Sequence, residues 1–542
     1  MTHRNAPARA GAERIPLRAW LTLLAVAVGA FVTQIDGLVV AVASPDIAAG
    51  LRAGPAQIQW VSTAQLLALA SLAIPAGTLA DRFGRKRIFL LGVGGFTASS
   101  LLCGLAGSIE LLIGGRVLQG ASSALLLPAA LGALRAAFPP NRLPTALGVF
   151  GSVTALALTG APQLGGWLVE HLGWSWAFFV TVPFGILGIG IGALVISESA
   201  QRVSNPLDLP GVLTSTIAVV SLAWAVTGVQ DNGWASAQTI GLAVVSIVFF
   251  AGFLVVERLS AHPMVPLGLF RNRSFSVGLV LLALTLIGMS AVTFYLMFYL
   301  QGVQGKRSAD AATALLPLFI AYMIAPPTGG LLTQRFGARA TMMLGAACNA
   351  IAFAFLLRLA PDSATLTLAV PLALIGVGTG FLMVASMEAV LGTVPAEQAG
   401  VAAGVKQAVS QLASTLGIAG FGTLLASLIS AEFPDAVRTA LAPNTALAEQ
   451  VAEDPGIQQQ VGLGFPPSST QTLPRDLTDT VVTTITDTAH RVFTDGVHVV
   501  FGVCIVIAVL AGALAVFVRD PNTESPCDTD RPARAVDQAP IS

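Results

Sequence analysis

Fourteen long apolar stretches dominate this chain of 542 residues. A helix needs about 20 apolar residues to cross the hydrocarbon core of a bilayer. Backbone groups inside a bilayer must be hydrogen-bonded within helices or closed barrels. We therefore predict an all-α membrane protein. Its expected spans are 18–43, 57–80, 88–107, 110–137, 143–169, 174–197, 209–229, 236–257, 274–300, 311–333, 340–360, 365–391, 401–430 and 491–518.

The composition excludes several classes of protein. Charged residues make up 10% of the chain, against about 25% in soluble proteins, and the mean hydropathy is +0.78. A soluble enzyme, a nucleic-acid binder and a disordered scaffold are therefore excluded, and the expected surroundings are a lipid bilayer. The four Cys residues are scattered along the chain, so neither a disulfide framework nor a metal site is expected.

The first apolar stretch has two interpretations. Basic residues between Arg4 and Arg18 precede it, and Ala41-Val42-Ala43 resembles a signal-peptide cleavage site. However, the stretch is too long for a signal peptide, contains Asp36 and is followed by Pro45. We interpret it as a retained membrane helix.

Loop charges indicate the orientation. With fourteen spans and a cytoplasmic N-terminus, the inner segments carry nineteen Lys and Arg residues and the outer segments carry seven. Because cytoplasmic loops are enriched in Lys and Arg, both termini are predicted to be cytoplasmic. The long outer segment 431–490 has eight acidic and two basic residues. We expect it to lie outside the packed regions and to be dispensable for activity.

A short pattern occurs twice. Gly, Leu, Arg, Phe and Gly recur at identical spacing in 77–85 and 330–338, which are 253 residues apart. Many secondary transporters are built from repeated bundles, so each copy is expected after the second helix of a six-helix half. The alternative is two unrelated loops that share turn glycines and inner arginines. The predicted parts are an N-terminal tail 1–17, a six-helix bundle 18–197, a linker 198–273 with two extra spans, a second six-helix bundle 274–518 and a C-terminal tail 519–542.

Several motifs resemble those of one known family. They are GTLADRFGRKR at 77–87, LIGGRVLQGA at 112–121, PQLGG at 162–166, DGLVVAVASP at 36–45 and HPMVP at 262–266. In this order they resemble the fourteen-helix drug:proton antiporter branch of the major facilitator superfamily. Leu38, Ala41, Ala161 and Ser175 depart from the usual motif residues, and these losses make the implied pocket less polar.

The resemblance implies a fold, an activity and partners. The fold would be the major-facilitator type, with two six-helix bundles and two inserted helices. The activity would be export of amphipathic organic compounds, such as antibiotics or drugs, from a bacterial cell across its inner membrane. Protons would be the exchanged partner. No phosphate-binding P-loop is visible, so no cofactor is expected beyond the proton gradient.

Asp36 and Arg116 are the candidate proton-coupling residues. Charged groups in mid-membrane are costly and therefore functional candidates. At 1.5 Å per residue, both lie about 9–10 Å below the outer surface. A guanidinium favours an ionised carboxyl group, whereas burial favours the neutral form, so a carboxyl group between the two can bind and release a proton. The alternative is an ion pair that only fixes helix packing.

Two further motifs are expected to act in gating. Asp81 with Arg82 and Arg85 would form a carboxylate–guanidinium latch at the inner gate, within a loop that begins at Gly77, and Gly84 would permit its tight turn. In the second copy Gln334 replaces the Asp. Pro162 would kink the fifth span, while Gly160, Gly165 and Gly166 would let a neighbouring helix approach closely.

Five other residues are candidates for lining a substrate cavity: Gln34, Gln119, Phe294, Tyr295 and Phe298. Aromatic rings can stack on a planar or cationic ligand. The alternatives to an exporter are an uptake symporter of the same fold, a membrane-embedded lipid-linked transferase, and a membrane sensor. A transferase would need clustered catalytic acids or histidines at one membrane face, and a sensor would need a signalling domain in one of the short tails.

Overall fold

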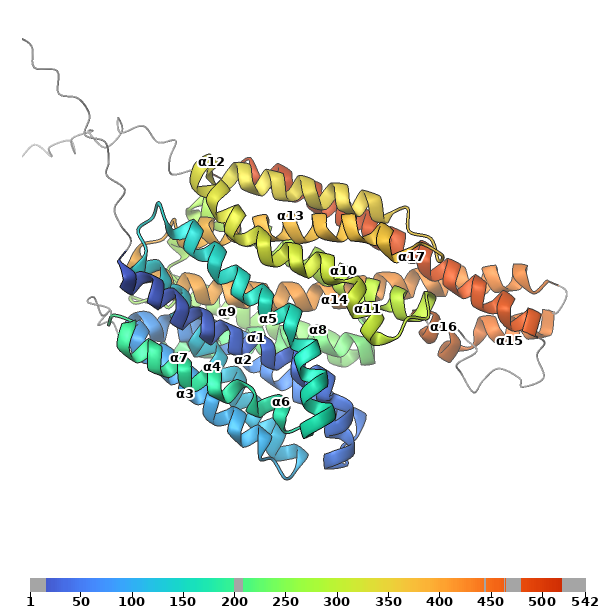
Figure 1. Cartoon of the computed structure of the whole chain (residues 1–542), viewed down its shortest axis with the longest axis horizontal. Helices are drawn as coiled ribbons and strands as arrows, with labels where there is room; N and C mark the ends of the chain where they lie inside the picture. Colours follow the sequence, from blue (N-terminus) through green and yellow to red (C-terminus); the bar gives the residue numbers. More distant parts are fainter. Residues whose placement is uncertain (1–15, 199–207, 443–444, 463, 465–478, 519–542) are drawn as a thin grey trace, which may run out of the picture.

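Every regular element of the protein is helical within the residues that the structure describes. This computed structural model describes residues 16–198, 208–442, 445–462, 464 and 479–518. Fourteen helical stretches in this part are long and apolar enough to span a membrane, and they lie side by side along the long axis (Figure 1). The prediction of an all-α, fourteen-span membrane protein is confirmed. The tails predicted at 1–17 and 519–542 fall almost wholly outside the described residues.

The first six spans form the N-terminal half. They are α1 (Leu17–Leu51), α2 (Pro55–Phe83), α3 (Arg85–Gly104), α4 (Ile109–Ala137), α5 (Leu143–Leu172), and α6 (Trp176–Phe179) together with α7 (Thr181–Val195). α1 runs unbroken through 41–43 and Pro45. The segment that resembles a cleavage site is therefore part of a continuous helix.

The inserted pair and the C-terminal half follow. The pair is α8 (Leu209–Asn232) and α9 (Ala237–Leu259), after which comes the short η1 (Leu267–Arg271). The C-terminal half comprises α10 (Arg273–Phe298) with η2 (Tyr299–Val303), the short α11 (Ser308–Ala314), α12 (Leu316–Leu356), α13 (Thr365–Leu391), η3 (Ala396–Gln398), α14 (Ala399–Ala440) and α17 (Asp479–Ala515). α12 contains two spans, which meet at Gly337, where φ is +88°.

The two halves meet through glycines near one end of the bundle. We call this end, which carries Gly84 and Gly337, the motif end. A methyl group added to Gly77 of α2 would lie 2.2 Å from the carbonyl oxygen of Gly400 on α14. A methyl group on Gly148 of α5 would lie 2.4 Å from the carbonyl oxygen of Pro326 on α12. Any larger residue would force the backbones apart, so these glycines allow the halves to close at the motif end.

At the opposite end, the segment 431–490 is largely helical rather than an unpacked loop. α14 continues to Ala440 and α17 begins at Asp479, while α15 (Thr445–Glu453) and α16 (Pro455–Gly462) lie between them. This helical cap projects beyond the bundle (Figure 1). Its apolar residues form one cluster with α10 and α17; the cluster includes Phe433, Val437, Leu441, Leu447, Val451, Ile457, Val461, Ile485 and Phe493. The expectation that this segment lies outside the packed regions is therefore wrong for its described residues.

Removal of α15 and α16 should destabilise the protein without altering its activity. We expect replacement of residues 445–462 by a short Gly/Ser linker to lower the melting temperature by at least about 5 °C. The reason is that each buried aliphatic side chain contributes about 1.5–3 kcal/mol, and Phe433 and Val437 would lose their cover. Thermal unfolding in detergent measures this effect. Arg438→Ala is the control, because it removes only exposed ion pairs to Asp435 and Glu449. An unchanged melting temperature would show that the cap contributes no stability.

Candidate functional site

A cluster of buried polar side chains joins four helices of the N-terminal half. We call Asp36, Gln65, Ser100, Arg116 and Gln119 the Asp36 cluster; they come from α1, α2, α3 and, for the last two, α4. Each is at most 5% exposed. Buried apolar residues pack near the cluster, among them Ile35, Val39, Val61 and Leu112.

Arg116 and Asp36 form the ion pair at its centre. One terminal nitrogen of Arg116 lies 2.5 Å from Oδ2 of Asp36 and 2.8 Å from Oε1 of Gln119. The Arg116 Nε donates to the carbonyl oxygen of Val61 at 2.8 Å, and the guanidinium lies 5.8 Å from the centre of the Phe178 ring. The pairing expected from the depths of these two residues is present. Its role in proton coupling remains a prediction.

Each side chain that is hydrogen-bonded to the Asp36 carboxylate acts as the donor. Gln65 Nε2 donates to Oδ2 at 3.1 Å and Gln119 Nε2 donates to Oδ1 at 3.1 Å, in addition to the bond from Arg116. An ionised carboxylate is an acceptor only, whereas a protonated one must also donate. Both Asp36 oxygens therefore act as acceptors in this arrangement. A proton placed there would face donors on both oxygens and would require a neighbouring group to turn.

Gln65 is the neighbour that is able to turn. The Gln119 amide is held on both sides, because its oxygen accepts from Arg116 and its nitrogen also donates to Ser100 Oγ at 2.8 Å. The Gln65 amide is held through its bond to Asp36. A flip of the Gln65 amide would present its oxygen to a protonated Asp36. Sequence reasoning missed Gln65 and Ser100, whose only signal is that they are polar residues inside apolar spans.

Two candidate cavity residues on α1 and α4 have different surroundings. Gln119 is fully buried, and its amide is engaged within the Asp36 cluster. It therefore supports Asp36 rather than facing an open cavity. Gln34 lies two residues before Asp36 on α1 and is half-buried.

Asp81 links the two halves at the motif end. Its carboxylate accepts hydrogen bonds from the backbone N–H groups of Gly400 and Val401 at 3.0 Å each. These groups belong to the first turn of α14, where unpaired donors and the helix dipole favour an anion. Arg85 lies 3.0 Å from the same carboxylate. Asp81 thus joins α2 of one half to α14 of the other.

Arg82 does not take part in this contact, contrary to the prediction. Its guanidinium lies 5.2 Å from the centre of the Phe83 ring and away from Asp81. An adjacent residue on a helix points in a different direction, whereas Arg85 lies one turn further on the same face.

The second copy of the repeat reproduces this local geometry. The Arg335 guanidinium lies 5.3 Å from the Phe336 ring. Gly84 and Gly337 have φ values of +102° and +88°, so both occupy the region that favours glycine. Gln334 accepts from Thr145 of α5 at 3.3 Å instead of capping a helix. The repeat in the sequence therefore corresponds to a repeat in the structure. The latch itself is asymmetric, because Asp81 of the first copy caps a helix and Gln334 of the second does not.

The glycines of the fifth-span motif differ in their surroundings. A methyl group on Gly165 would lie 3.1 Å from Cα of Val39 on α1, so the expected close approach occurs there. Methyl groups on Gly160 and Gly166 would meet no other atom within 4 Å. The predicted close contact is therefore wrong for these two, because a side chain at either position would enter open space. Pro162 lies within α5, and its side chain is outside the described part of the chain.

The three aromatic candidates on α10 contact one another in one cluster. Phe294 meets Tyr295 and Phe298 edge to face, with ring centres 5.2 and 4.8 Å apart. The Tyr295 hydroxyl donates to the carbonyl oxygen of Ile418 on α14 at 2.9 Å, and Tyr295 is 2% exposed. Tyr295 therefore fixes α10 against α14, while Phe294 and Phe298 are half-buried.

Two six-helix halves, an inserted pair and a buried ion pair between α1 and α4 define a multi-pass membrane transporter. The chain belongs to the Major Facilitator Superfamily, whose family model matches residues 26–418. The predicted family is confirmed. Members of this family are transporters and not enzymes, which excludes the lipid-linked transferase.

Similar proteins occur in bacteria. The chain is 34% identical over 520 residues to the tetracenomycin C resistance and export protein of Streptomyces glaucescens, covering 95% of each chain. It is also 34% identical over 412 residues to the multidrug resistance protein Stp of Mycobacterium tuberculosis, covering 76% of each chain. Among solved structures, the proton:xylose symporter XylE matches with a TM-score of 0.59 at 11% identity, covering 94% of this chain and 97% of the other. This last likeness shows the fold alone.

Proposed function

We propose that the protein exports amphipathic organic compounds from a bacterial cell across its inner membrane in exchange for protons. The relatives named as an antibiotic exporter and a multidrug resistance protein support export. The observation that carries proton exchange is the Asp36 carboxylate, which is fully buried yet surrounded by hydrogen-bond donors only. Binding of one proton would break this arrangement, so protonation and helix position are coupled.

The loop charges support an orientation with the motif end in the cytoplasm. Arg82, Arg85, Lys86 and Arg87 lie at the motif end, so the positive-inside rule places this end in the cytoplasm. The glycine contacts and the Asp81 contact then close the cytoplasmic side. In alternating access, one bundle moves against the other around a fixed site. Proton binding at Asp36 from the outside would precede release of the Asp81 contact.

The direction of proton movement tests this proposal. Purified protein in liposomes, with a pH indicator inside, is given tetracenomycin C from the outside while the membrane potential is clamped. We expect compound uptake to be accompanied by proton exit, because the two share one exchange cycle. Liposomes without protein are the control. Protons that move in the same direction as the compound would identify a symporter instead.

Neutralisation of Asp81 should slow the cycle more than it weakens compound binding. We expect Asp81→Asn to reduce the maximal transport rate about tenfold, the equivalent of about 1.4 kcal/mol. The reason is that an amide cannot replace a carboxylate that accepts from two backbone N–H groups and a guanidinium. Initial rates over a range of compound concentrations separate the maximal rate from the affinity. Arg82→Gln is the matched control, because Arg82 lies outside the contact. A changed affinity at an unchanged maximal rate would contradict the role of Asp81 as a latch.

A further inference from the structure

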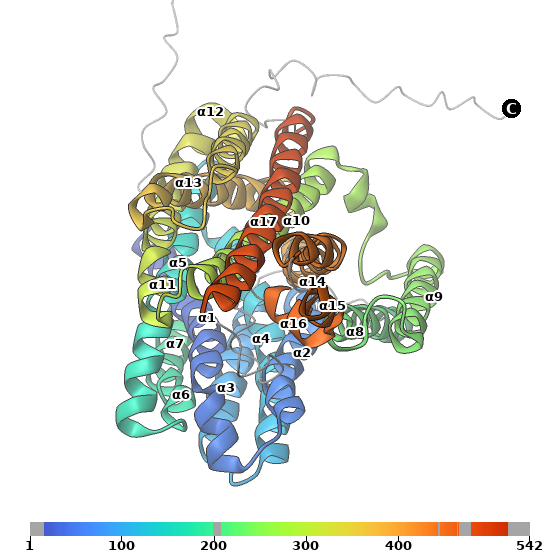
Figure 2. The ribbon, with the colours of Figure 1, turned by 90° about the vertical axis from the view of Figure 1, so that its right-hand side faces the viewer.

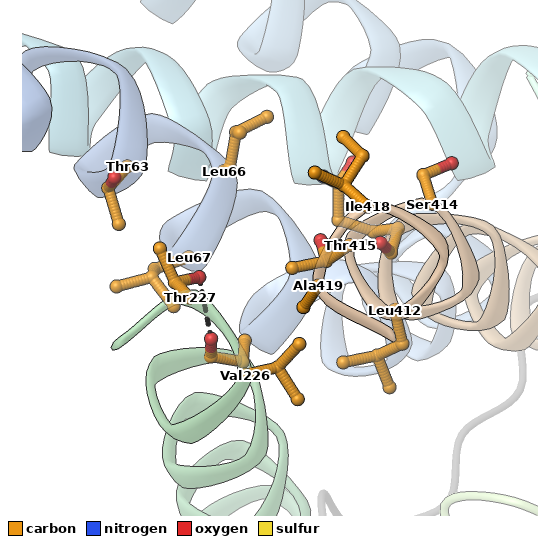
Figure 3. Close-up of a pocket in the computed structure, with 12 residues that line it drawn as sticks. Thr63, Leu66, Leu67, Val226, Thr227, Leu412, Ser414, Thr415, Ile418 and Ala419 are labelled. Carbon is orange, nitrogen blue, oxygen red and sulfur yellow. Dashed lines mark hydrogen bonds between the residues drawn. The ribbon is translucent and has the colours of Figure 1, made fainter. Parts of the chain in front are cut away.

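A pocket lies where the inserted helix α8 meets both halves of the transporter. It has a volume of about 210 Å³ and is formed by α2, α8 and α14 (Figure 3). Viewed from the cap end, α8 stands beside α2 and α14, next to the boundary between the two halves (Figure 2). Six-helix halves alone would lack the third wall of this pocket.

Helix geometry explains why the space exists. α2 and α14 touch closely at Gly77 and Gly400, and a methyl group on Gly404 would lie 2.4 Å from the carbonyl oxygen of Ala73. Further from the motif end, the facing residues are larger, and α8 fills only part of the gap between them. α8 is held to α2 through an edge-to-face contact between Trp60 and Trp224, whose ring centres are 5.6 Å apart.

The lining contains no charged residue. Seven of its residues are apolar: Leu66, Leu67, Ala223, Val226, Leu412, Ile418 and Ala419. The other five are neutral and polar: Thr63, Thr227, Gln411, Ser414 and Thr415. A pocket with mostly apolar walls and a few placed polar groups is typical of a small-molecule site. A charged ligand would find no counter-ion here, so the lining suits an uncharged ligand.

Two of the four hydroxyl groups in the lining offer acceptors rather than donors. Thr227 Oγ1 donates to the carbonyl oxygen of Ala223 at 2.7 Å, and Thr415 Oγ1 donates to that of Gln411 at 2.9 Å. Each hydroxyl hydrogen is thus used within its own helix, while the oxygen lone pairs remain available. A ligand hydroxyl can donate to them.

The volume limits the size of the ligand. A cavity of about 150 Å³ holds benzene, whereas drug-sized ligands occupy about 300–1,000 Å³. The 210 Å³ of this pocket therefore suits a molecule of one or two rings, or one end of a larger molecule. Leu66, which is 44% exposed, lies at its rim.

The pocket and the Asp36 cluster share α2. Gln65 donates to Asp36, and the Val61 carbonyl oxygen accepts from Arg116. Thr63, Leu66 and Leu67, on the same two turns, line the pocket. Because these turns are one rigid piece of helix, a change at Asp36 that moves α2 also changes the pocket.

We propose that the pocket between α2, α8 and α14 binds an uncharged, hydroxyl-bearing aromatic group of one or two rings. The proposal rests on the proposed function in so far as the bound compound is the exported one. It gives the inserted helix pair a part in compound recognition, with Ala223, Val226 and Thr227 of α8 forming one wall.

Photolabelling of the whole protein tests the site without requiring transport. The probe is 3-hydroxybenzophenone, a neutral two-ring phenol, applied at pH 6 to protein in lipid nanodiscs and irradiated. We expect adducts, mapped by mass spectrometry, on peptides that contain residues 63–67, 223–227 and 411–419. The labelling should saturate and should be displaced by unlabelled 3-phenylphenol. Adducts only at other positions, or labelling that does not saturate, would overturn the proposal.

Variants distinguish the pocket from the lipid-facing surface. Ala223→Phe should fill the space and weaken labelling at least about tenfold. Thr415→Val should weaken it about three- to tenfold, which corresponds to the loss of one neutral hydrogen bond, but should not change labelling by benzophenone, which has no hydroxyl. Leu416→Phe, on the exposed face of α14, is the matched control and should leave labelling unchanged. Equal labelling of Ala223→Phe and the parent protein would refute the site.

The outcomes separate this proposal from the proposed function. One outcome is that the pocket is labelled but the protein moves no compound when a proton gradient is applied. That outcome would contradict export and support the pocket. Export with labelling that avoids the pocket would support the proposed function and contradict the pocket. A cationic probe, benzoylbenzyltrimethylammonium, should label at least about tenfold more weakly, because none of the lining residues is charged.

Discussion

Asp36→Asn should abolish proton-driven export while compound exchange without net transport continues. Asn cannot bind and release a proton, so the step that ties proton flow to helix movement is lost. The variant resembles the permanently protonated state, in which the halves still interconvert. We therefore expect export driven by a pH gradient to fall to the level of empty liposomes. Exchange of labelled for unlabelled compound at equal pH should remain measurable.

The structure adds a control for this experiment. Arg116 is 1% exposed, and breaking a buried ion pair costs about 3–5 kcal/mol because one charge is left unpaired. Asp36→Asn combined with Arg116→Gln removes both charges and should recover stability without recovering proton coupling. Melting temperatures and both transport assays on the two variants separate folding from function. Export driven by a pH gradient in either variant would exclude Asp36 as the proton carrier.

Arg116→Ala should make export dependent on an alkaline cell interior. Without the guanidinium, the positive charge that favours an ionised carboxylate is lost, whereas burial, which favours the neutral form, remains. Proton release to the cytoplasm then limits the cycle. We expect transport to fall at least about tenfold at neutral internal pH and to recover partly as the internal pH is raised. Arg116→Lys keeps the charge but loses the planar guanidinium that bonds Asp36, Gln119 and Val61 together, so it should be impaired less.

A double-mutant cycle on the transport rate quantifies this coupling. If the pair acts as one unit, the effects of Asp36→Asn and Arg116→Ala will not add. Ser123→Ala is a matched control on α4, because the Ser123 hydroxyl donates to a backbone carbonyl oxygen of its own helix at 2.9 Å. Additive effects, together with an unshifted pH profile in Arg116→Ala, would mean that the two residues act independently.

The membrane spans could be predicted because hydrophobic thickness sets helix length. All fourteen were expected in order, and the depths of Asp36 and Arg116 brought that pair together. The helical cap could not be predicted in the same way. Its helices mix polar residues with apolar residues such as Leu447 and Val451, and their hydropathy does not distinguish them from a loop.

Contacts between distant parts of the chain could not be predicted from the sequence either. Asp81 binds the backbone of Gly400, 319 residues away, through N–H groups that every residue except proline has. No residue type in α14 indicates this contact. Gln65 was missed for a related reason, since an isolated amide in an apolar helix has many uses and its partner on α1 is visible only in the folded bundle.

The close glycine contact between Gly77 and Gly400 offers a means to select one conformation of the transporter. A single methyl group on Gly77 would overlap the Gly400 carbonyl oxygen at 2.2 Å, so Gly77→Ala would prevent closure at the motif end. Such a protein would accumulate in the opposite state of its cycle, independently of pH or compound. It would supply a homogeneous sample for raising conformation-specific antibody fragments and for screening inhibitors that bind from the cytoplasm.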